Sequence, residues 1–219
     1  MCLCVETIRI TDDLMPSPEI LALHQERIDR TCRELYGLTD GFCLVAALKA
    51  VPVPPVLQNG TVKCRVVYGS SGIVSVEHSP YTPPRIRSLL AVTDDGIDYT
   101  YKFCDRTQLA ALHERAMAEG CNDALIVRRG LITDTTFCNV AFRVSDSSPE
   151  MWHTPAEPLL RGTMREYLIK QGTVVPCDIS VTALHNNFYD QVTLFNALNG
   201  FGSLTLPVGR IIFRAPYFL

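Results

Sequence analysis

The sequence predicts an α+β protein built from two parts. Stretches with helical spacing and stretches with strand alternation both occur along the 219 residues, but they do not follow the repeated β-α-β rhythm of a doubly wound sheet. A proline-rich stretch near the middle, residues 78–102, has the weakest regular pattern and is the expected connection. We therefore expect a small N-terminal domain over residues 1–100 and a larger C-terminal domain over residues 101–219.

The N-terminal part begins with a strand and a long helix. The run VETIRI predicts a strand over residues 5–10. A helix is expected over residues 17–37, because Ser17 can cap its start, Pro18 suits its first turn and Gly37 can close its end. At 3.6 residues per turn, one apolar stripe runs along this helix and contains Leu21, His24, Ile28, Cys32 and Leu35.

The remaining elements follow from the same patterns of spacing and turn residues. In the N-terminal part we expect a short helical piece (41–50), a proline-rich loop (51–60), a strand (61–69) and two short extended pieces within residues 78–102. In the C-terminal part we expect a helix (107–120), a hairpin (124–133) turning at Arg129 and Gly130, a strand (137–144) that continues the hairpin's sheet, a helix (162–172), a strand (173–179), a short helix and a strand (191–198).

Charge and composition point to a small-molecule ligand. The net charge is −3 and the isoelectric point is near 5.9, which gives no general attraction to nucleic acid or to anionic membranes. No apolar run has membrane-spanning length, and Glu6 and Arg9 interrupt the N-terminus where a signal sequence would be apolar, so we expect a cytoplasmic protein.

The cysteines indicate neither disulfides nor a metal site. Most of the nine stand singly in apolar runs, which is typical of buried, reduced thiols: Cys43, Cys64, Cys104, Cys121 and Cys138. The C-x-C pair at the N-terminus has no second cysteine or histidine pair at zinc-site spacing, so no metal is expected.

Two residues could carry chemistry on their own evidence. Lys102 stands between Tyr101 and Phe103, and burial against aromatic rings would favour the neutral, nucleophilic form of its amine. The alternative is a strand-end lysine that reaches solvent. Asp134 follows the expected hairpin, where it could face a ligand or simply cap a turn.

The order of several short motifs resembles one enzyme family. The motifs are VETIRI, HQERI, KFCDR, the block CNDALIVRRGLITDTTFCNVAF, TP followed by RGTMR, and LFNAL followed by LPV. Together they resemble the fold-type IV pyridoxal-phosphate enzymes, or class IV aminotransferases, and most of all the aminodeoxychorismate lyases. The resemblance implies a two-domain D-amino-acid-aminotransferase-like fold. Members begin further upstream of the segment that matches VETIRI, so the N-terminal domain is expected to be shortened.

The resemblance also implies a role for each matching residue. Lys102 would hold pyridoxal 5′-phosphate covalently and act as catalytic base or acid. Asp134 stands where the family has a glutamate facing the pyridine nitrogen, and its side chain is one methylene shorter. Phosphate would be bound by the residues of three separate motifs: Arg27 beside the apolar stripe, Thr163 and Met164 at the start of a helix, and Asn196 and Ala197 in LFNAL.

The resemblance also implies that Arg106 contacts the cofactor, and this residue favours one reaction within the family. Aminotransferases usually have a tyrosine here, whereas the lyases have the pattern K-x-x-N-R, which KFCDR resembles; a solvated first-turn arginine is the alternative. We therefore expect a homodimeric lyase that forms 4-aminobenzoate, a folate precursor, and pyruvate. An amino-acid aminotransferase and a cofactor-binding protein without turnover are the alternatives, and the substrate in either reaction is a small-molecule amine.

Overall fold

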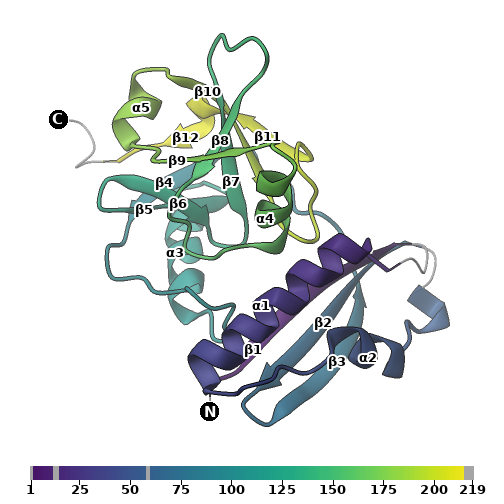
Figure 1. Ribbon diagram of the computed structural model, residues 1–219. Helices are drawn as coiled ribbons and strands as arrows, with labels where there is room; N and C mark the ends of the chain where they lie inside the picture. Colours follow the sequence, from purple (N-terminus) through teal and green to yellow (C-terminus); the bar gives the residue numbers. More distant parts are fainter. Residues whose placement is uncertain (1, 12–14, 58–59, 215–219) are drawn as a thin grey trace. The chain divides into compact units, whose positions relative to one another are not determined.

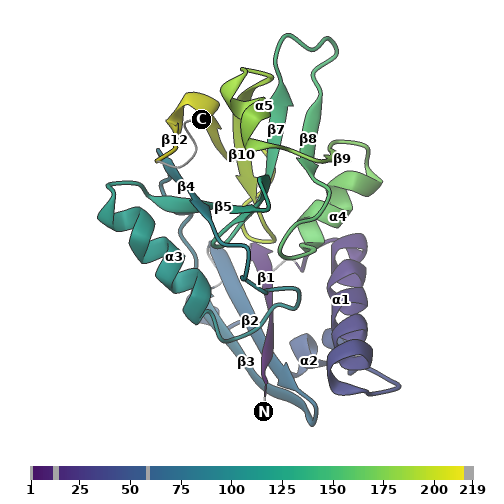
Figure 2. The same ribbon diagram turned by 90° about the vertical axis from the view of Figure 1, so that its left-hand side faces the viewer.

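The computed structural model describes residues 2–11, 15–57 and 60–214. The chain divides into two compact units. The first unit lies within residues 1–83 and 101–105, and the second within residues 84–100 and 106–219. Both contain helices and strands (Figures 1 and 2), as the predicted α+β class requires, whereas the division into domains at Thr100 stays a prediction. No helix of the described residues is long and apolar enough to cross a membrane.

A three-stranded antiparallel sheet in the order β1-β2-β3 forms the first unit's frame. Its strands are β1 (Cys4–Thr11), β2 (Thr61–Gly69) and β3 (Gly72–Pro80). The helices are α1 (Pro18–Tyr36) and α2 (Leu44–Ala50), followed by the short 3-10 helix η1 (Pro55–Leu57). One core cluster joins α1 to the sheet and includes Ile8, Ile28, Cys32, Cys64 and Val66.

Local signals fixed the ends of α1 as predicted. The Ser17 hydroxyl oxygen accepts a hydrogen bond from the Ile20 amide at 3.4 Å. Gly37 has φ +67°, and its amide bonds to the Cys32 carbonyl oxygen. Of the predicted apolar stripe, His24, Ile28 and Cys32 are buried, and the two leucines are partly buried.

Strand β3 was not predicted from the sequence. It pairs with β2 along its whole length, from Val62 opposite Pro80 to Gly69 opposite Gly72. Its residues are only partly buried on either face, and Val74 is 58% exposed, so the sequence lacks the alternation that marks a half-buried strand. Of the two extended pieces expected within residues 78–102, only β4 (Leu89–Thr93) is a regular strand, and it belongs to the second unit.

The segment 101–105 returns to the first unit and lies beside β1. The Val5 amide donates to the Lys102 carbonyl oxygen at 2.9 Å, and the Cys104 amide donates to the Leu3 carbonyl oxygen at 2.8 Å. Cys4 and Phe103 are bridge partners between these two bonds. The main chain of Lys102 is thus fixed on the edge of β1.

In its described residues, the second unit forms two sheets. The four-stranded sheet has the order β12-β4-β5-β6, and the five-stranded sheet has the order β11-β10-β7-β8-β9. The strands after β4 are β5 (Asp123–Arg128), β6 (Leu131–Thr135), β7 (Asn139–Val144), β8 (Trp152–Pro155), β9 (Val175–Cys177), β10 (Tyr189–Phe195), β11 (Leu204–Pro207) and β12 (Ile211–Ile212). The helices are α3 (Thr107–Ala118), α4 (Thr163–Lys170), α5 (Val181–His185) and the 3-10 helix η2 (Val208–Arg210).

The predicted hairpin is present, but the strand after it changes sheets. Strands β5 and β6 pair around the turn at Arg129 and Gly130, whose φ angles are 51° and 77°. The prediction that residues 137–144 continue this sheet was wrong, because β7 pairs with β8 and β10 in the other sheet. A tight turn causes the switch: the Thr135 amide bonds to the Cys138 carbonyl oxygen, and the Cys138 amide bonds to the Thr135 hydroxyl oxygen.

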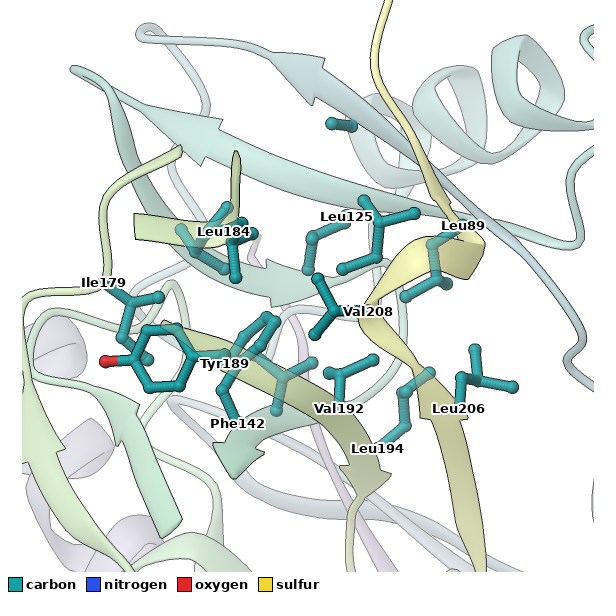
Figure 3. Packing of buried hydrophobic residues seen from close by; sticks show 14 of the residues in the cluster. Leu89, Leu125, Phe142, Ile179, Leu184, Tyr189, Val192, Leu194, Leu206 and Val208 are labelled. Carbon is teal, nitrogen blue, oxygen red and sulfur yellow. The ribbon is translucent and has the colours of Figure 1, made fainter. Parts of the chain in front are cut away.

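Apolar side chains from both sheets form the main core of the second unit. Figure 3 shows Leu89 and Leu125 of the four-stranded sheet meeting Phe142, Val192 and Leu194 of the five-stranded sheet. Packing two sheets over one apolar layer explains why their strands were recognisable as apolar runs. Cys138, in the connection from β6 to β7, belongs to the same cluster.

All nine cysteines lie in the described part of the chain, and none forms a disulfide. Cys64, Cys121 and Cys138 are buried, as predicted. Cys43 is exposed and Cys104 is half-buried, so the prediction of burial was wrong for these two. Cys43 lies at the N-cap of α2, outside the core-facing part of that helix.

Candidate active site

A buried ionic cluster joins β1 to α1 in the first unit. The Arg27 guanidinium donates to Glu6 through Nε to Oε1 at 2.8 Å and through Nη2 to Oε2 at 2.5 Å. His24 Nδ1 lies 2.5 Å from Glu6 Oε2. Glu6 and His24 are fully buried, and Arg27 is 6% exposed.

The charges in this cluster are set by burial and by Arg27. Burial alone would raise the pKa of Glu6, but the charge of Arg27 and the hydrogen bonds from Arg27 and His24 outweigh it and lower this pKa to about 2. Burial lowers the pKa of His24, so the imidazole is neutral and its Nδ1–H donates to Glu6. The cluster therefore holds one negative and one positive charge.

Arg27 points inward toward an anion, as its place beside the apolar stripe suggested, and that anion is the carboxylate of Glu6. Its assigned role as a phosphate ligand stays a prediction. Sequence reasoning gave Glu6 no role, although a signal was present. Glu6 shares the inward face of β1 with Cys4, Ile8 and Ile10, and a carboxylate on such a face requires a buried partner.

Lys102 lies near this cluster. Its charge is close enough to help lower the pKa of His24. The side chain is half-buried, and the flanking rings of Tyr101 and Phe103 pack edge to face at 5.9 Å against the first unit's core. Tyr101 also donates its hydroxyl to Glu34 at 3.1 Å. The aromatic neighbours thus anchor the short segment that carries the lysine.

In the second unit, Asp134 is a buried carboxylate at the end of β6. It is 4% exposed. Its Oδ1 accepts from Asn139 Nδ2 at 2.8 Å, and its Oδ2 accepts from the Leu160 amide at 2.9 Å. Burial raises the pKa of Asp134 to about 6, although these hydrogen bonds and the charge of Arg165 act in the opposite direction.

Thr163 and Met164 form the first turn of α4. Thr163 is buried and Met164 half-buried. The N-cap is Gly162, which has no side chain to accept from the amides of that turn. The next residue, Arg165, is buried, and its Nη2 donates to the Pro155 carbonyl oxygen at 2.7 Å. Within the described residues, Arg165 Nε is buried without a hydrogen-bond partner.

Asn196 shapes the turn that follows β10. Its Oδ1 accepts from the amides of Leu198 and Asn199 at 2.8 and 2.9 Å. Its Nδ2 donates to the Phe137 carbonyl oxygen at 3.0 Å and contacts Cys138 Sγ at 3.2 Å. The side chain therefore ties its own turn, which includes the half-buried Ala197, to the connection between β6 and β7.

Arg106 contacts the same connection. It is the N-cap residue of α3, and its Nη2 donates to the Thr136 carbonyl oxygen at 2.5 Å. The Thr136 hydroxyl donates to Asp123 Oδ1 at 2.6 Å, and His113 Nδ1 lies 3.1 Å from that same oxygen. Although Arg106 is exposed, its guanidinium is held by the fold.

The predicted site residues thus gather in two groups, one in each unit. In the second unit, Arg106, Asn196 and the segment just before α4 all contact residues 134–139, a range that includes Asp134. In the first unit, Glu6 bonds to Arg27 and His24, and the charge of Lys102 helps lower the pKa of His24. Sequence reasoning missed Glu6, which bonds to Arg27 and His24, and Asn139, which bonds to Asp134 and to the Leu160 carbonyl oxygen.

Comparison with known proteins identifies the family. The family profile described as amino-transferase class IV matches residues 3–205. An uncharacterized protein of Haemophilus influenzae is 29% identical over 198 residues, which cover 90% of this chain and 96% of that protein. A crystal structure from Haemophilus somnus 129PT, named a "putative 4-amino-4-deoxychorismate lyase", is 30% identical, with a TM-score of 0.77 over 91% of this chain and 98% of the other.

More distant structures share the fold. A crystal structure from Mesorhizobium loti, named a "putative amino-acid aminotransferase", has a TM-score of 0.74 at 18% identity, and the match covers 98% of this chain and 100% of that one. The fold and these matches are those of a pyridoxal-phosphate enzyme of fold type IV, as the motifs had suggested. The chain belongs to the class IV aminotransferase family.

Proposed function

We propose that this protein is a 4-amino-4-deoxychorismate lyase that releases pyruvate and 4-aminobenzoate, acting as a homodimer in the cytoplasm. The observation that carries the proposal is the contact of Arg106 with the Thr136 carbonyl oxygen, two residues beyond Asp134. It supports a role for the arginine that distinguishes the lyase pattern from the aminotransferase pattern. The likeness to the Haemophilus somnus protein, at 30% identity, supports the same reaction.

The residues of the second unit fit the two ends of pyridoxal phosphate. The first turn of α4 lies at the positive end of the helix, and Gly162 brings no side chain to it, so an anion such as phosphate suits this turn. Asp134 is a buried carboxylate that would gain a compensating charge from a protonated ring nitrogen. Because aspartate is one methylene shorter than glutamate, the pyridine ring must come closer to the Asp134 carboxylate.

The cofactor supplies an electron-accepting ring when it is bound. Lys102 would hold it covalently and then move a proton on the substrate; its side chain is half-buried, and the flanking rings of Tyr101 and Phe103, which pack against each other, anchor its segment. Arg27 would contact the phosphate while Glu6 keeps its guanidinium oriented. The first turn of α4 and the turn at Asn196 and Ala197 would bind the remaining phosphate oxygens.

Cofactor attachment is tested first. Purified protein incubated with pyridoxal phosphate should turn yellow, and the visible absorbance should be absent in Lys102→Ala. The control is Lys49→Ala, which removes an exposed lysine on α2. A wild-type protein that stays colourless under these conditions would reject both the lyase and the aminotransferase.

A paired assay then separates the two reactions. The lyase should release pyruvate and 4-aminobenzoate from 4-amino-4-deoxychorismate without any keto acid. Amino transfer that requires a keto acid, with no release of 4-aminobenzoate, would instead establish an amino-acid aminotransferase. Bound cofactor without either activity would indicate a binding protein without turnover.

A further inference from the structure

Asn139 joins two parts of the second unit that the proposed function assigns to opposite ends of the cofactor. Its Nδ2 donates both to Asp134 Oδ1 at 2.8 Å and to the Leu160 carbonyl oxygen at 2.9 Å. The Leu160 amide in turn donates to Asp134 Oδ2 at 2.9 Å. Three hydrogen bonds therefore close a ring through the carboxylate, the amide side chain and the main chain that leads into α4.

The other side of Asn139 is fixed by close packing. A Cβ atom built on Gly162 would lie 1.9 Å from Asn139 Oδ1, so only glycine lets the main chain approach the amide this closely. Asn139 is 6% exposed and Asp134 4% exposed. Since both amide hydrogens of Nδ2 have acceptors and Oδ1 is packed against the chain, Asn139 has little freedom to move.

We propose that Asn139 is a positioning residue that sets the spacing between the Asp134 carboxylate and the first turn of α4, so that one ligand can bind to both at once. This inference rests on the proposed function, which assigns Asp134 to the ring nitrogen and the α4 turn to the phosphate. Preorganising two subsites removes the cost of ordering them when the ligand binds. This gain in affinity exists only for a ligand that binds to both subsites at once.

The proposal predicts that removing Asn139 changes the affinity for the intact ligand and for its separate halves to different extents. Pyridoxine 5′-phosphate carries both the ring and the phosphate but has no aldehyde, so it cannot bond to Lys102. Pyridoxine and inorganic phosphate each carry one half. At a pH well above the pKa of Asp134, where this carboxyl is ionised with or without Asn139, removing Asn139 should weaken binding of the intact compound and leave binding of either half nearly unchanged.

The experiment is calorimetric titration of wild type, Asn139→Ala and Asn186→Ala with these three compounds. Asn186 is exposed at the C-terminus of α5 and serves as the matched control. Asn139→Ala should weaken pyridoxine 5′-phosphate about tenfold or more, in line with the loss of a hydrogen bond to a charged group, and each half by less than about twofold. Equal losses for the intact compound and for one half would overturn the proposal, as would no loss at all.

A second measurement does not depend on the cofactor. The Asn139 N–H bond to Asp134 is one of the contacts that lower the pKa of this carboxyl, so its removal should raise that pKa further in the ligand-free protein. Carbon NMR titration of Asp134 in wild type, Asn139→Ala and the milder Asn139→Ser measures the shift. An unchanged titration in folded variants would overturn the proposal, whereas a wild type that binds no pyridoxal phosphate but shows the shift would reject the proposed function alone.

Discussion

Glu6 and Arg27 form a bidentate ion pair in the interior of the first unit, with N–O distances of 2.8 and 2.5 Å. The pair connects the first strand to the first helix across 21 residues of sequence. Because both groups are removed from water, each depends on the other for compensation of its charge.

Replacing Glu6 by glutamine should destabilise the protein strongly. The change leaves the buried guanidinium of Arg27 without a counter-charge, and breaking a buried pair on one side costs about 3–5 kcal/mol. Urea unfolding measures the loss. The control is Glu77→Gln, because Glu77 is 60% exposed, lies 3.8 Å from Arg65, and a surface pair of this kind contributes at most about 1 kcal/mol. Equal losses for the two variants would contradict the buried pairing.

Acid should remove the contribution of Glu6. Its folded pKa of about 2 lies below its ordinary value of 4.5, so the folded state favours the charged form. The stabilisation, about 3 kcal/mol, is fully present above pH 4.5 and is lost as the pH falls toward 2. Unfolding free energies of wild type and Glu6→Gln, measured from pH 7 to pH 2.5, should therefore converge in acid. A constant difference across that range would show that Glu6 does not titrate in this way.

The sequence predicted those helix ends and turns that depend only on neighbouring residues. Ser17 and Gly37 marked the ends of α1, and the pair at Arg129 and Gly130 marked the hairpin, because caps and turns depend on neighbouring residues. Strand β3 was not predicted, because it is defined by its pairing with β2 and not by an alternation of buried and exposed residues.

The candidate site was predictable only through its motifs. Lys102 and Asp134 were named as candidates because they stand in recognisable segments, and their roles stay predictions. The partner of Arg27 was not found, because Glu6 meets it only after β1 and α1 pack together. Asn139 was also missed, since its acceptor at Leu160 is 21 residues away along the chain. Contacts between distant segments follow from the tertiary fold, which the spacing of residue types does not specify.

Asp134 should give a pH dependence of the opposite sign to that of Glu6. Its folded pKa of about 6 lies above the ordinary value of 3.8, so between these values the folded state keeps a proton that the unfolded chain has released. The contribution of this group to stability therefore falls, by up to about 3 kcal/mol, as the pH rises from 4 through 6. The difference in unfolding free energy between Asp134→Asn and wild type should rise over that interval in the ligand-free protein. A flat difference would contradict the raised pKa.

Alanine at position 162 should be poorly tolerated. Its Cβ would lie 1.9 Å from Asn139 Oδ1, so either the amide or the main chain before α4 must move. Overpacking of this kind costs about 1–3 kcal/mol, and the displaced amide should also weaken binding of pyridoxal phosphate. Thermal unfolding and cofactor titration check the two effects. Gly209→Ala is the control, because a Cβ there meets nothing within 4 Å; comparable stability of the two variants would show that the site can relax.

Arg106 should matter more for the reaction than for holding the cofactor. Lysine keeps the positive charge but lacks the planar guanidinium, so it cannot donate to the Thr136 carbonyl oxygen and present further N–H groups in the same geometry. Under the proposed function, Arg106→Lys should lower the rate of pyruvate release about tenfold or more, by analogy with the loss of a charged hydrogen bond. The visible absorbance of the bound cofactor should remain.

The matched control for that variant is Arg115→Lys, which changes an exposed arginine on the same helix. It should leave both the rate and the absorbance unchanged. Equal loss of absorbance and of rate in Arg106→Lys would show that the residue mainly retains the cofactor. An unchanged rate would remove the residue on which the choice of a lyase over an aminotransferase rests, because the other proposed contacts serve either reaction equally well.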